Sequence, residues 1–352
     1  MRMRKHFATG AAMAAAATMV LTACGGGSST SPSTSSSSSD SGAPKGTITA
    51  GSAYETTDYG PITTSALGIG ADWQVLEGLY RFDMSDYSVS PALAAGDPVK
   101  VSDTKYEVTL RDGAKFSDGT DVKAADVVSS YKRTTDEKSI YRQFFTFVDS
   151  VEAKDDKTVT ITLKHPFAAL KERFVNVRVV PSSMSEDELK SKPIGSGPYK
   201  FDNISATEVT AVPNEHYNGK IPAKAATLKW SVLKDDSARL AAALGNSIDI
   251  MEAVPADAAD KLKAASWTVD SKAGYGNPFM MFNTQKAPFD KPEVRRAFLK
   301  AIDKEKLVSS ALRGQAVEAK SFLPEVNPAF KKPATDLSYN KDAAKKALDE
   351  AG

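Results

Sequence analysis

Hydrophobic and polar residues alternate through residues 104–111, and the period then changes. Tyr106, Val108 and Leu110 are separated by single polar residues, which predicts a strand with one apolar face. Two Asp-Gly pairs follow, at 112–113 and 118–119, and such pairs are typical of tight turns. Beyond them the apolar residues follow helical spacing, at Ala124, Val127, Val128 and Tyr131. The pattern therefore predicts a strand, a turn-rich connection and an amphipathic helix.

A second alternating strand is predicted at 158–163, where Val159, Ile161 and Leu163 share one face. Its sequence is similar to that of the first strand, so the two are expected to pair in one small sheet. Further strands are predicted at 46–50, 208–212, 228–232, 247–250 and 278–283. Helices are predicted at 66–76, 91–95, 185–190, 236–244, 292–302 and 343–351, and one more starting at Pro255.

The order of these elements indicates a fold class. Strands alternate with helices along most of the chain, which predicts α/β lobes with mostly parallel, buried sheets. Asp236 or Ser237 is expected to cap the helix that ends at Gly245. The Gly- and Pro-rich run at 193–199 excludes a regular element there.

The N-terminal residues have the pattern of an export signal. Residues 1–24 combine a basic start, an apolar run at 8–20 that is too short to span a bilayer comfortably, and Leu-Thr-Ala-Cys at 21–24. That ending resembles the lipobox of bacterial lipoproteins, which implies lipidation of Cys24. The alternative is an ordinary secretory signal in which Cys24 is incidental. Residues 25–43 are nearly all Gly, Ser and Thr, which predicts a flexible tether of roughly 25 Å root-mean-square length.

Composition limits the classes of partner. The chain of 352 residues has 45 basic and 44 acidic residues, so a nucleic-acid partner is not expected. Its length allows two or three domains after the tether. Cys24 is the only cysteine, which rules out an internal disulfide within the chain and leaves stability to the hydrophobic core. No other segment is apolar enough to predict a membrane span.

Enzymatic motifs are weak. His165 and His216 are the only histidines after the signal, and neither lies near a G-x-S-x-G nucleophile motif. No H-E-x-x-H motif or cysteine cluster predicts a metal site, and Gly68-Ile69-Gly70 lacks the third glycine of a dinucleotide fingerprint. We therefore expect a protein that is not an enzyme, with no cofactor and no metal.

Five stretches together resemble one bacterial family. They are V-L-E-G-L-Y-R-F-D at 75–83 with S-P-A-L-A at 90–94, L-R-D-G-A-K-F-S-D-G at 110–119, G-S-G-P-Y at 195–199, D-S-A-R-L at 236–240 with G-N-S-I-D at 245–249, and F-N-T at 282–284 with P-F-D at 288–290 and V-R-R-A at 294–297. Their order and spacing are similar to those of the peptide-binding group of solute-binding proteins, which serve dipeptide, oligopeptide and nickel ABC importers. Asn218 departs from that pattern, because the family usually carries Trp there.

The resemblance implies an α/β fold of two lobes, the type II clamshell of periplasmic binding proteins, with a small α+β subdomain inserted into the first lobe. The first lobe would comprise 44–73 and 193–271, the inserted subdomain 74–192, and the second lobe would begin at 272. The family continues well beyond the equivalent of Gly352, so the second lobe is expected to be incomplete in 272–352. The chain would then be a fragment or a degenerate member of the family.

Aromatic and polar residues near the expected lobe boundary are candidates for ligand contacts. Tyr54, Glu55 and Tyr59 follow the first strand, and Tyr275 and Asn277 lie in the crossover between lobes. Ordinary packing is the alternative for each aromatic ring. Gly274 and Gly276 flank Tyr275 and are candidate hinge positions.

The resemblance predicts an exported, monomeric lipoprotein that captures a small peptide by hinge closure for an ABC permease and ATPase. Cys24 would anchor it at the outer face of the cytoplasmic membrane. Oligosaccharides, metal chelates and opines remain as alternative ligands. A surface sensor or adhesion protein of the same fold, with no transport role, is the alternative function.

Overall fold

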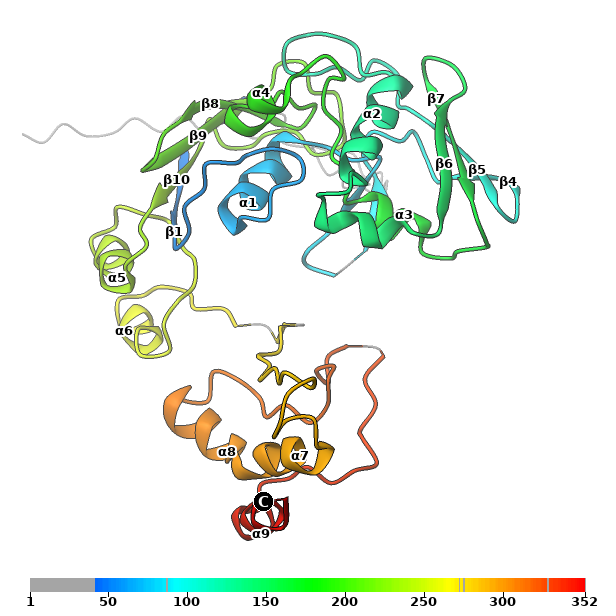
Figure 1. Ribbon diagram of the computed structural model, residues 1–352. Helices are drawn as coiled ribbons and strands as arrows, with labels where there is room; N and C mark the ends of the chain where they lie inside the picture. The colour runs from blue at the N-terminus through cyan, green and yellow to red at the C-terminus, as the bar shows by residue number, and fades with distance from the viewer. Residues whose placement is uncertain (1–41, 87, 272, 275, 328, 352) are drawn as a thin grey trace, which may run out of the picture. The chain divides into compact units, whose positions relative to one another are not determined.

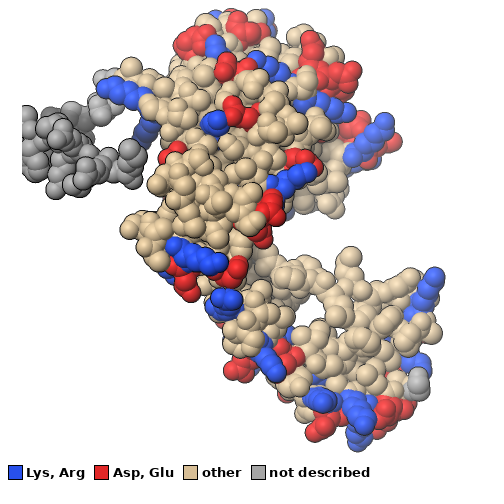
Figure 2. Space-filling view, turned by 90° about the vertical axis from the view of Figure 1, so that its left-hand side faces the viewer, with Lys and Arg blue, Asp and Glu red and all other residues tan. Residues whose placement is uncertain are grey.

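The computed structural model describes residues 42–86, 88–271, 273–274, 276–327 and 329–351 (Figure 1). The expected signal, tether and Cys24 lie outside these residues, except for the last two tether positions. No helix within the described ranges has the length and hydropathy needed to cross a membrane. Figure 2 shows basic and acidic side chains interspersed over the face that it draws.

A five-stranded sheet contains the first strand of the chain. Its order is β11-β1-β10-β9-β8. The strands are β1 (Thr47–Ser52), β8 (Tyr199–Ile204), β9 (Glu208–Pro213), β10 (Thr227–Val232) and β11 (Ile250–Met251). β1 runs parallel to both of its neighbours, whereas β10, β9 and β8 pair antiparallel. The expectation of mostly parallel sheets is therefore wrong. Only three residues join β8 to β9, and a connection that short can join only antiparallel strands.

A four-stranded antiparallel sheet follows in the chain, in the order β4-β5-β7-β6. The strands are β4 (Val99–Ser102), β5 (Lys105–Thr109), β6 (Val148–Ala153) and β7 (Thr158–Leu163). The predicted pairing of the two alternating strands is confirmed, with Tyr106 opposite Ile161 and Val108 opposite Val159. β2 (Tyr80–Phe82) and β3 (Val89–Pro91) form a separate two-stranded ribbon.

The predicted amphipathic helix is α2 (Ala124–Thr134), which contacts β6 and β7 (Figure 1). Ala124 and Val127 are fully buried, and Val128 and Tyr131 pack partly buried against the same core. This core takes its residues from Leu79 to Val179, and therefore from the segment expected to be the inserted subdomain. Its exact boundaries stay a prediction.

Five shorter helices accompany these sheets: α1 (Ala66–Val75), η1 (Ile140–Phe145), α3 (Leu170–Phe174), α4 (Glu186–Ser191) and α6 (Ala259–Ala264). α1 packs on a second core with Tyr199, Phe201 and Val209. α5 (Asp236–Leu244) and α6 form a third core with Ile248. The cap of α5 is Asp235, whose carboxylate accepts from the Ala238 amide at 2.9 Å, and not Asp236 or Ser237.

Residues after 276 form a further group of helices: α7 (Pro292–Ala301), α8 (Lys304–Lys306), η2 (Leu307–Ala311) and α9 (Lys341–Ala351). α7 packs against α9. The ring centroids of Phe282, Phe289 and Phe298 lie 5.1 to 5.7 Å apart, so the second half of α7 packs on the preceding chain.

Three predicted elements are wrong, and of the strand predicted at 247–250 only Ile250 belongs to a strand, β11. Residues 91–95 are not helical, because the amides of Ala92 and Leu93 donate to carbonyls of 78–79 and so continue the β2–β3 pairing. Pro255 begins only a turn, and the helix starts at Ala259. Residues 278–283 form no strand, and no strand pairs with them in the described ranges.

Candidate functional site

The carboxyl ends of three parallel strands meet at one edge of the five-stranded sheet. β1 lies between β10 and β11, so Ser52, Val232 and Met251 end their strands side by side. In open sheets of this kind, ligands bind outside the carboxyl ends of the strands, where the chain turns away to either side. We call this place the carboxyl edge, made of Ser52–Glu55, Leu233–Lys234 and Glu252–Ala253.

Polar groups of the carboxyl edge are connected across the strands. The Ser52 hydroxyl, which is buried, donates to the Glu252 carboxylate at 2.9 Å and accepts from the Tyr54 amide at 3.2 Å. The Lys234 ammonium lies 2.9 Å from the Glu55 carboxylate. Both of these charged side chains are 60% exposed, so their ion pair is available to solvent and to a ligand.

The Arg239 side chain connects the segments that form the carboxyl edge. The residue is 1% exposed, although it carries a full charge. Its guanidinium donates to the carbonyls of Leu233, Lys234, Glu252 and Ala253 at 2.8 to 3.2 Å, and also to the Asp236 carboxylate. One side chain on α5 therefore fixes the segments that leave β10 and β11, which positions Lys234 and Glu252.

Two of the predicted site residues lie at the carboxyl edge. Tyr54 is 47% exposed, and Glu55 makes the ion pair with Lys234. Tyr59 does not accompany them. It is 2% exposed and packs edge-on against Phe201 at 5.6 Å between ring centroids. Burial raises the pKa of the Tyr59 hydroxyl, and the nearby Asp72 carboxylate raises it further. Its ring fills the core, where a ligand could reach it only if the core opened.

The remaining predicted residues come from the segment after residue 271. Asn277 donates from its amide to the carbonyls of Ser321 and Phe322 at 3.2 and 3.3 Å. It lines a cavity of about 560 Å³ together with Gly274, Gly276 and Val317. Tyr275 lies outside the described residues. The structure therefore connects Asn277 with the 314–326 segment, and the role of these residues toward a ligand stays a prediction.

Sequence reasoning missed Ser52, Lys234, Arg239 and Glu252. Arg239 belongs to a stretch that was recognised only as a helix pattern. Its signal was a charged residue on the face of that helix otherwise made of alanine and leucine. Ser52 ends β1, and Lys234 and Glu252 stand within two residues beyond the ends of β10 and β11, but the sequence alone does not say which strands are neighbours.

Neither of the two histidines in the described residues lies at the carboxyl edge. No group of three or more His, Cys, Asp or Glu side chains in the described part of the chain could hold a metal ion. His216 is partly exposed, and its Nε2 atom lies 4.0 Å from the Glu215 carboxylate. The exposed His165 ring contacts only the adjacent Pro166 carbonyl, at 3.3 Å.

Comparison with known proteins identifies the family. Residues 88–352 match the family model described as bacterial extracellular solute-binding proteins, family 5 middle. The chain belongs to this family. Curated relatives include the glutathione-binding protein GsiB of Salmonella typhi and of Escherichia coli, each 27% identical over 320 residues. These alignments cover 87% of this chain and 61% of the relative, so the chain spans about three fifths of their length.

Several solved structures of binding proteins share the fold. The chain is similar to the A. tumefaciens binding protein MoaA in complex with mannopinic acid, at 25% identity with a TM-score of 0.78 over 88% of this chain and 66% of that one. The A. tumefaciens protein AgaA in complex with agropinic acid is 26% identical, with a TM-score of 0.74 over 87% and 64%. The oligopeptide-binding protein AppA of Bacillus subtilis has a TM-score of 0.76 at 24% identity, over 88% and 65%. The predicted α/β fold of the two-lobed periplasmic binding proteins is confirmed.

Proposed function

We propose that this family 5 protein captures a small peptide outside the cytoplasm and delivers it to an ABC permease and its ATPase. The proposal is carried by the family match. The geometry agrees with it, because the parallel strands of the first sheet end at the carboxyl edge, which is exposed and charged. Relatives named for binding glutathione, itself a tripeptide, favour a short peptide as the ligand class. Solved relatives bound to opines make opines the second ligand class to test.

The ion pair between Glu55 and Lys234 suits a zwitterionic ligand. An ion pair this exposed contributes only about 0–1 kcal/mol, so it can open at little cost. The Glu55 carboxylate would then face the amino group of the peptide and the Lys234 ammonium its carboxylate. The exposed Tyr54 ring offers an apolar surface beside them. Capture would therefore exchange one internal ion pair for two with the ligand.

Closure of the second lobe would complete the site. Asn277 and Tyr275 would contribute from the crossover, with Gly274 and Gly276 as the hinge. A ligand that contacts both lobes binds the closed form better and so shifts the open–closed equilibrium toward it. A diacylglycerol on Cys24 would hold this monomeric protein at the membrane face, beside the permease, because more than one acyl chain is needed for stable anchoring.

Thermal unfolding with and without ligands tests this function. The purified protein would be melted alone, with pooled di- and tripeptides, with glutathione and with mannopinic acid. A ligand at about 100 times its dissociation constant stabilises the folded state by about 2.7 kcal/mol, which raises the melting temperature visibly. We expect the shift with peptides and a smaller shift in the Glu55→Gln and Lys234→Gln variants.

The matched control is Glu137→Gln, since Glu137 is exposed and lies on the segment between α2 and η1. It should melt and respond to peptide as the parent does. A shift with mannopinic acid alone would replace the peptide by an opine. A melt that ignores all these ligands would contradict the proposed capture function.

A further inference from the structure

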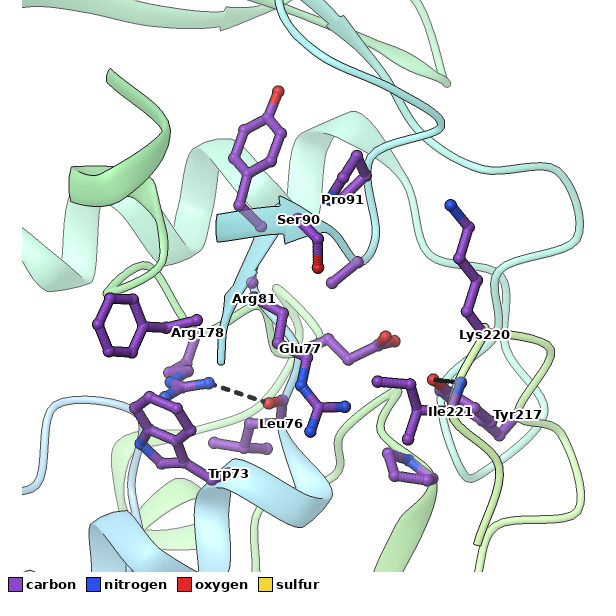
Figure 3. A pocket seen from close by; sticks show the side chains of 15 residues that line it. Trp73, Leu76, Glu77, Arg81, Ser90, Pro91, Arg178, Tyr217, Lys220 and Ile221 are labelled. Carbon is purple, nitrogen blue, oxygen red and sulfur yellow. Dashed lines mark hydrogen bonds between the residues drawn. The ribbon is translucent and has the colours of Figure 1, made fainter. Parts of the chain in front are cut away.

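A small cavity lies at the C-terminal end of α1, away from the carboxyl edge (Figure 3). Its volume is about 100 Å³, and it is lined by α1, by the β2–β3 ribbon, by the segment that carries Arg178 and by the loop at 217–221. β1 and α1 are joined by the 53–65 loop, which begins at the carboxyl edge and enters α1 at its N-terminus. The ten residues of α1 span about 15 Å, and the cavity lies at the opposite end of the helix from the point where the loop enters it.

Arg81 supplies the first charge. It stands on β2, and Figure 3 shows its guanidinium directed into the cavity. Among the residues that the structure describes, this guanidinium forms no hydrogen bond and no ion pair. A guanidinium has five N–H donors, and a partly buried one normally satisfies several of them. Arg81 is therefore a charged donor without an acceptor.

Arg178 supplies the second positive charge of the cavity. Its guanidinium stacks on the Trp73 ring, 4.7 Å from the ring centroid. Its one hydrogen bond within the described residues is long, 3.4 Å to the Leu76 carbonyl. Burial is the largest cause and lowers the pKa of Arg178, the nearby Asp72 carboxylate raises it, and the positive charge of Arg81 lowers it. The two guanidinium groups line the same cavity, so their positive charges repel each other.

The nearby carboxylates offset this charge only in part. Glu77 lines the cavity, but it is engaged by Arg111, which donates to its two carboxylate oxygens at 3.0 and 2.8 Å. Asp72 forms no ion pair with Arg178, and its buried Oδ1 atom has no hydrogen-bond partner. Burial raises the pKa of Asp72 well above its usual value, which weakens it as a source of negative charge. Lys220 adds one more positive charge to the lining.

We propose that Arg81 and Arg178 form a binding site for a small oxyanion, a phosphate or carboxylate group. Two guanidinium forks from different elements can each donate two N–H groups to such an anion and thereby relieve their repulsion. The size of the cavity selects for small groups. At about 100 Å³, the cavity has room for one oxyanion and is much smaller than the 560 Å³ cavity beside Asn277. The site is independent of the solute proposed above.

Titration of the purified full-length protein tests the site. Phosphate, sulfate and acetate would be added separately at constant ionic strength set by chloride, and binding followed by calorimetry and by tryptophan fluorescence. Because Arg178 stacks on Trp73, an anion on Arg178 should change the Trp73 emission, and the Trp73→Phe variant should lose that change. Phosphate or sulfate saturating first would identify a tetrahedral anion, and acetate a carboxylate.

We expect Arg81→Gln and Arg178→Gln each to weaken binding at least tenfold, and Arg81→Lys to weaken it less than Arg81→Gln. The matched control is Arg296→Gln on α7, which removes the same charge from an exposed residue and should leave binding unchanged. Melts in chloride alone establish that each variant folds. Binding that does not saturate, or that is equal in all the variants, would overturn the proposal. The peptide melts of the same variants report separately on solute capture, so either function can fail without the other.

Discussion

One buried charge, that of Arg239, stabilises the carboxyl edge of this protein. Arg239 makes four hydrogen bonds to carbonyl oxygens at the ends of β10 and β11 from a position that is 1% exposed. A carbonyl left without its donor inside a protein costs about 1–3 kcal/mol, so several losses at once are severe.

We predict that Arg239→Met destabilises the protein by about 3 kcal/mol or more, measured as the free energy of unfolding in urea. Methionine keeps the apolar stem but donates no hydrogen bond. Arg296→Met is the control, because Arg296 is exposed on α7, and it should change stability by less than about 0.5 kcal/mol. A loss below 1 kcal/mol for Arg239→Met would mean that water replaces the guanidinium at these carbonyls.

Asp72 should give the protein a characteristic pH dependence. Burial raises its pKa in the folded state above the value of about 3.9 that it has in the unfolded chain. Between these two pKa values the folded state binds one proton more than the unfolded state, so stability falls as the pH rises, by up to about 1.4 kcal/mol per pH unit. Below pH 4 both states are protonated and this penalty vanishes.

The test compares the parent with Asp72→Asn from pH 4 upward by urea unfolding. The asparagine does not titrate, and all other groups are shared, so the difference between the two curves reports Asp72. We predict that the parent loses stability relative to Asp72→Asn as the pH rises, until the pH passes the raised pKa. Parallel curves, or a parent that gains on the variant, would contradict the raised pKa.

The sequence predicted the polar loop after the first strand better than the role of each residue in it. The loop after the first strand was correctly taken as a polar loop, and Tyr54 and Glu55 are accessible there. The same reasoning placed Tyr59 beside them, because a sequence gives no sign of which tyrosine in a loop turns inward. Asn218, the departure from the family pattern, bonds to Arg111 and to the Asp112 carbonyl at 2.9 and 2.8 Å. Such a bond across 107 residues has no local signal.

At the scale of elements, local patterns were sufficient wherever an element makes its own hydrogen bonds or has a strict period. The helices at 66–75, 124–134 and 292–301 were predicted within about one to three residues. Two of the failures are elements whose state depends on a distant partner. Residues 91–95 pair with 78–80, and residues 278–283 lack a partner strand among the described residues. Whether an extended segment becomes a strand is decided by its neighbour.

The Gly-Ser-Gly-Pro-Tyr segment at 195–199 requires glycine where its backbone contacts the end of α1. A Cβ atom on Gly195 would lie 2.1 Å from the Val75 carbonyl oxygen, and one on Gly197 would lie 2.6 Å from it. The backbone of this segment therefore packs directly on the end of α1, and the Gly197 amide donates to the same carbonyl at 2.8 Å. No side chain fits between the two.

We predict that Gly195→Ala destabilises the protein by about 3 kcal/mol or more, because the helix end or the segment must move. Gly70→Ala is the matched control within α1. Its Cβ would meet nothing within 4 Å, and alanine in a helix interior is favoured over glycine by about 0.5–1 kcal/mol, so this variant should gain stability. Equal effects of the two substitutions, measured by urea unfolding, would show that the close approach to Val75 is not what constrains Gly195.

At the scale of the whole molecule, the family was evident from five short motifs, and the fold class followed from the family. The mixture of parallel and antiparallel strands in the first sheet did not follow, because the motifs fix the order of elements and not their pairing. The cavity with Arg81 and Arg178 could not be predicted from the sequence either. These two residues are 97 positions apart, and no pattern in the sequence connects them.

Hinge closure should depend on Gly274 and Gly276 in a way that separates binding from folding. In this conformation a Cβ on Gly276 would meet no described atom within 4 Å, and one on Gly274 would come no closer than 3.9 Å. The structure therefore gives alanine no steric penalty at either position. If closure moves this crossover into backbone angles that only glycine adopts readily, the penalty arises only in the closed, ligand-bound form.

We therefore predict that the double variant Gly274→Ala/Gly276→Ala keeps the unfolding free energy of the parent within about 0.5 kcal/mol and loses affinity for peptide about tenfold. A tenfold loss corresponds to about 1.4 kcal/mol of added cost in the closed form. Calorimetric titration with the peptide that shifts the melt measures this loss. Gly96→Ala is the control, because its Cβ also meets nothing within 4 Å and it lies outside the crossover. Unchanged affinity in the double variant would place the hinge elsewhere in the crossover, whereas a loss of stability without ligand would show that these glycines serve the fold and not its closure.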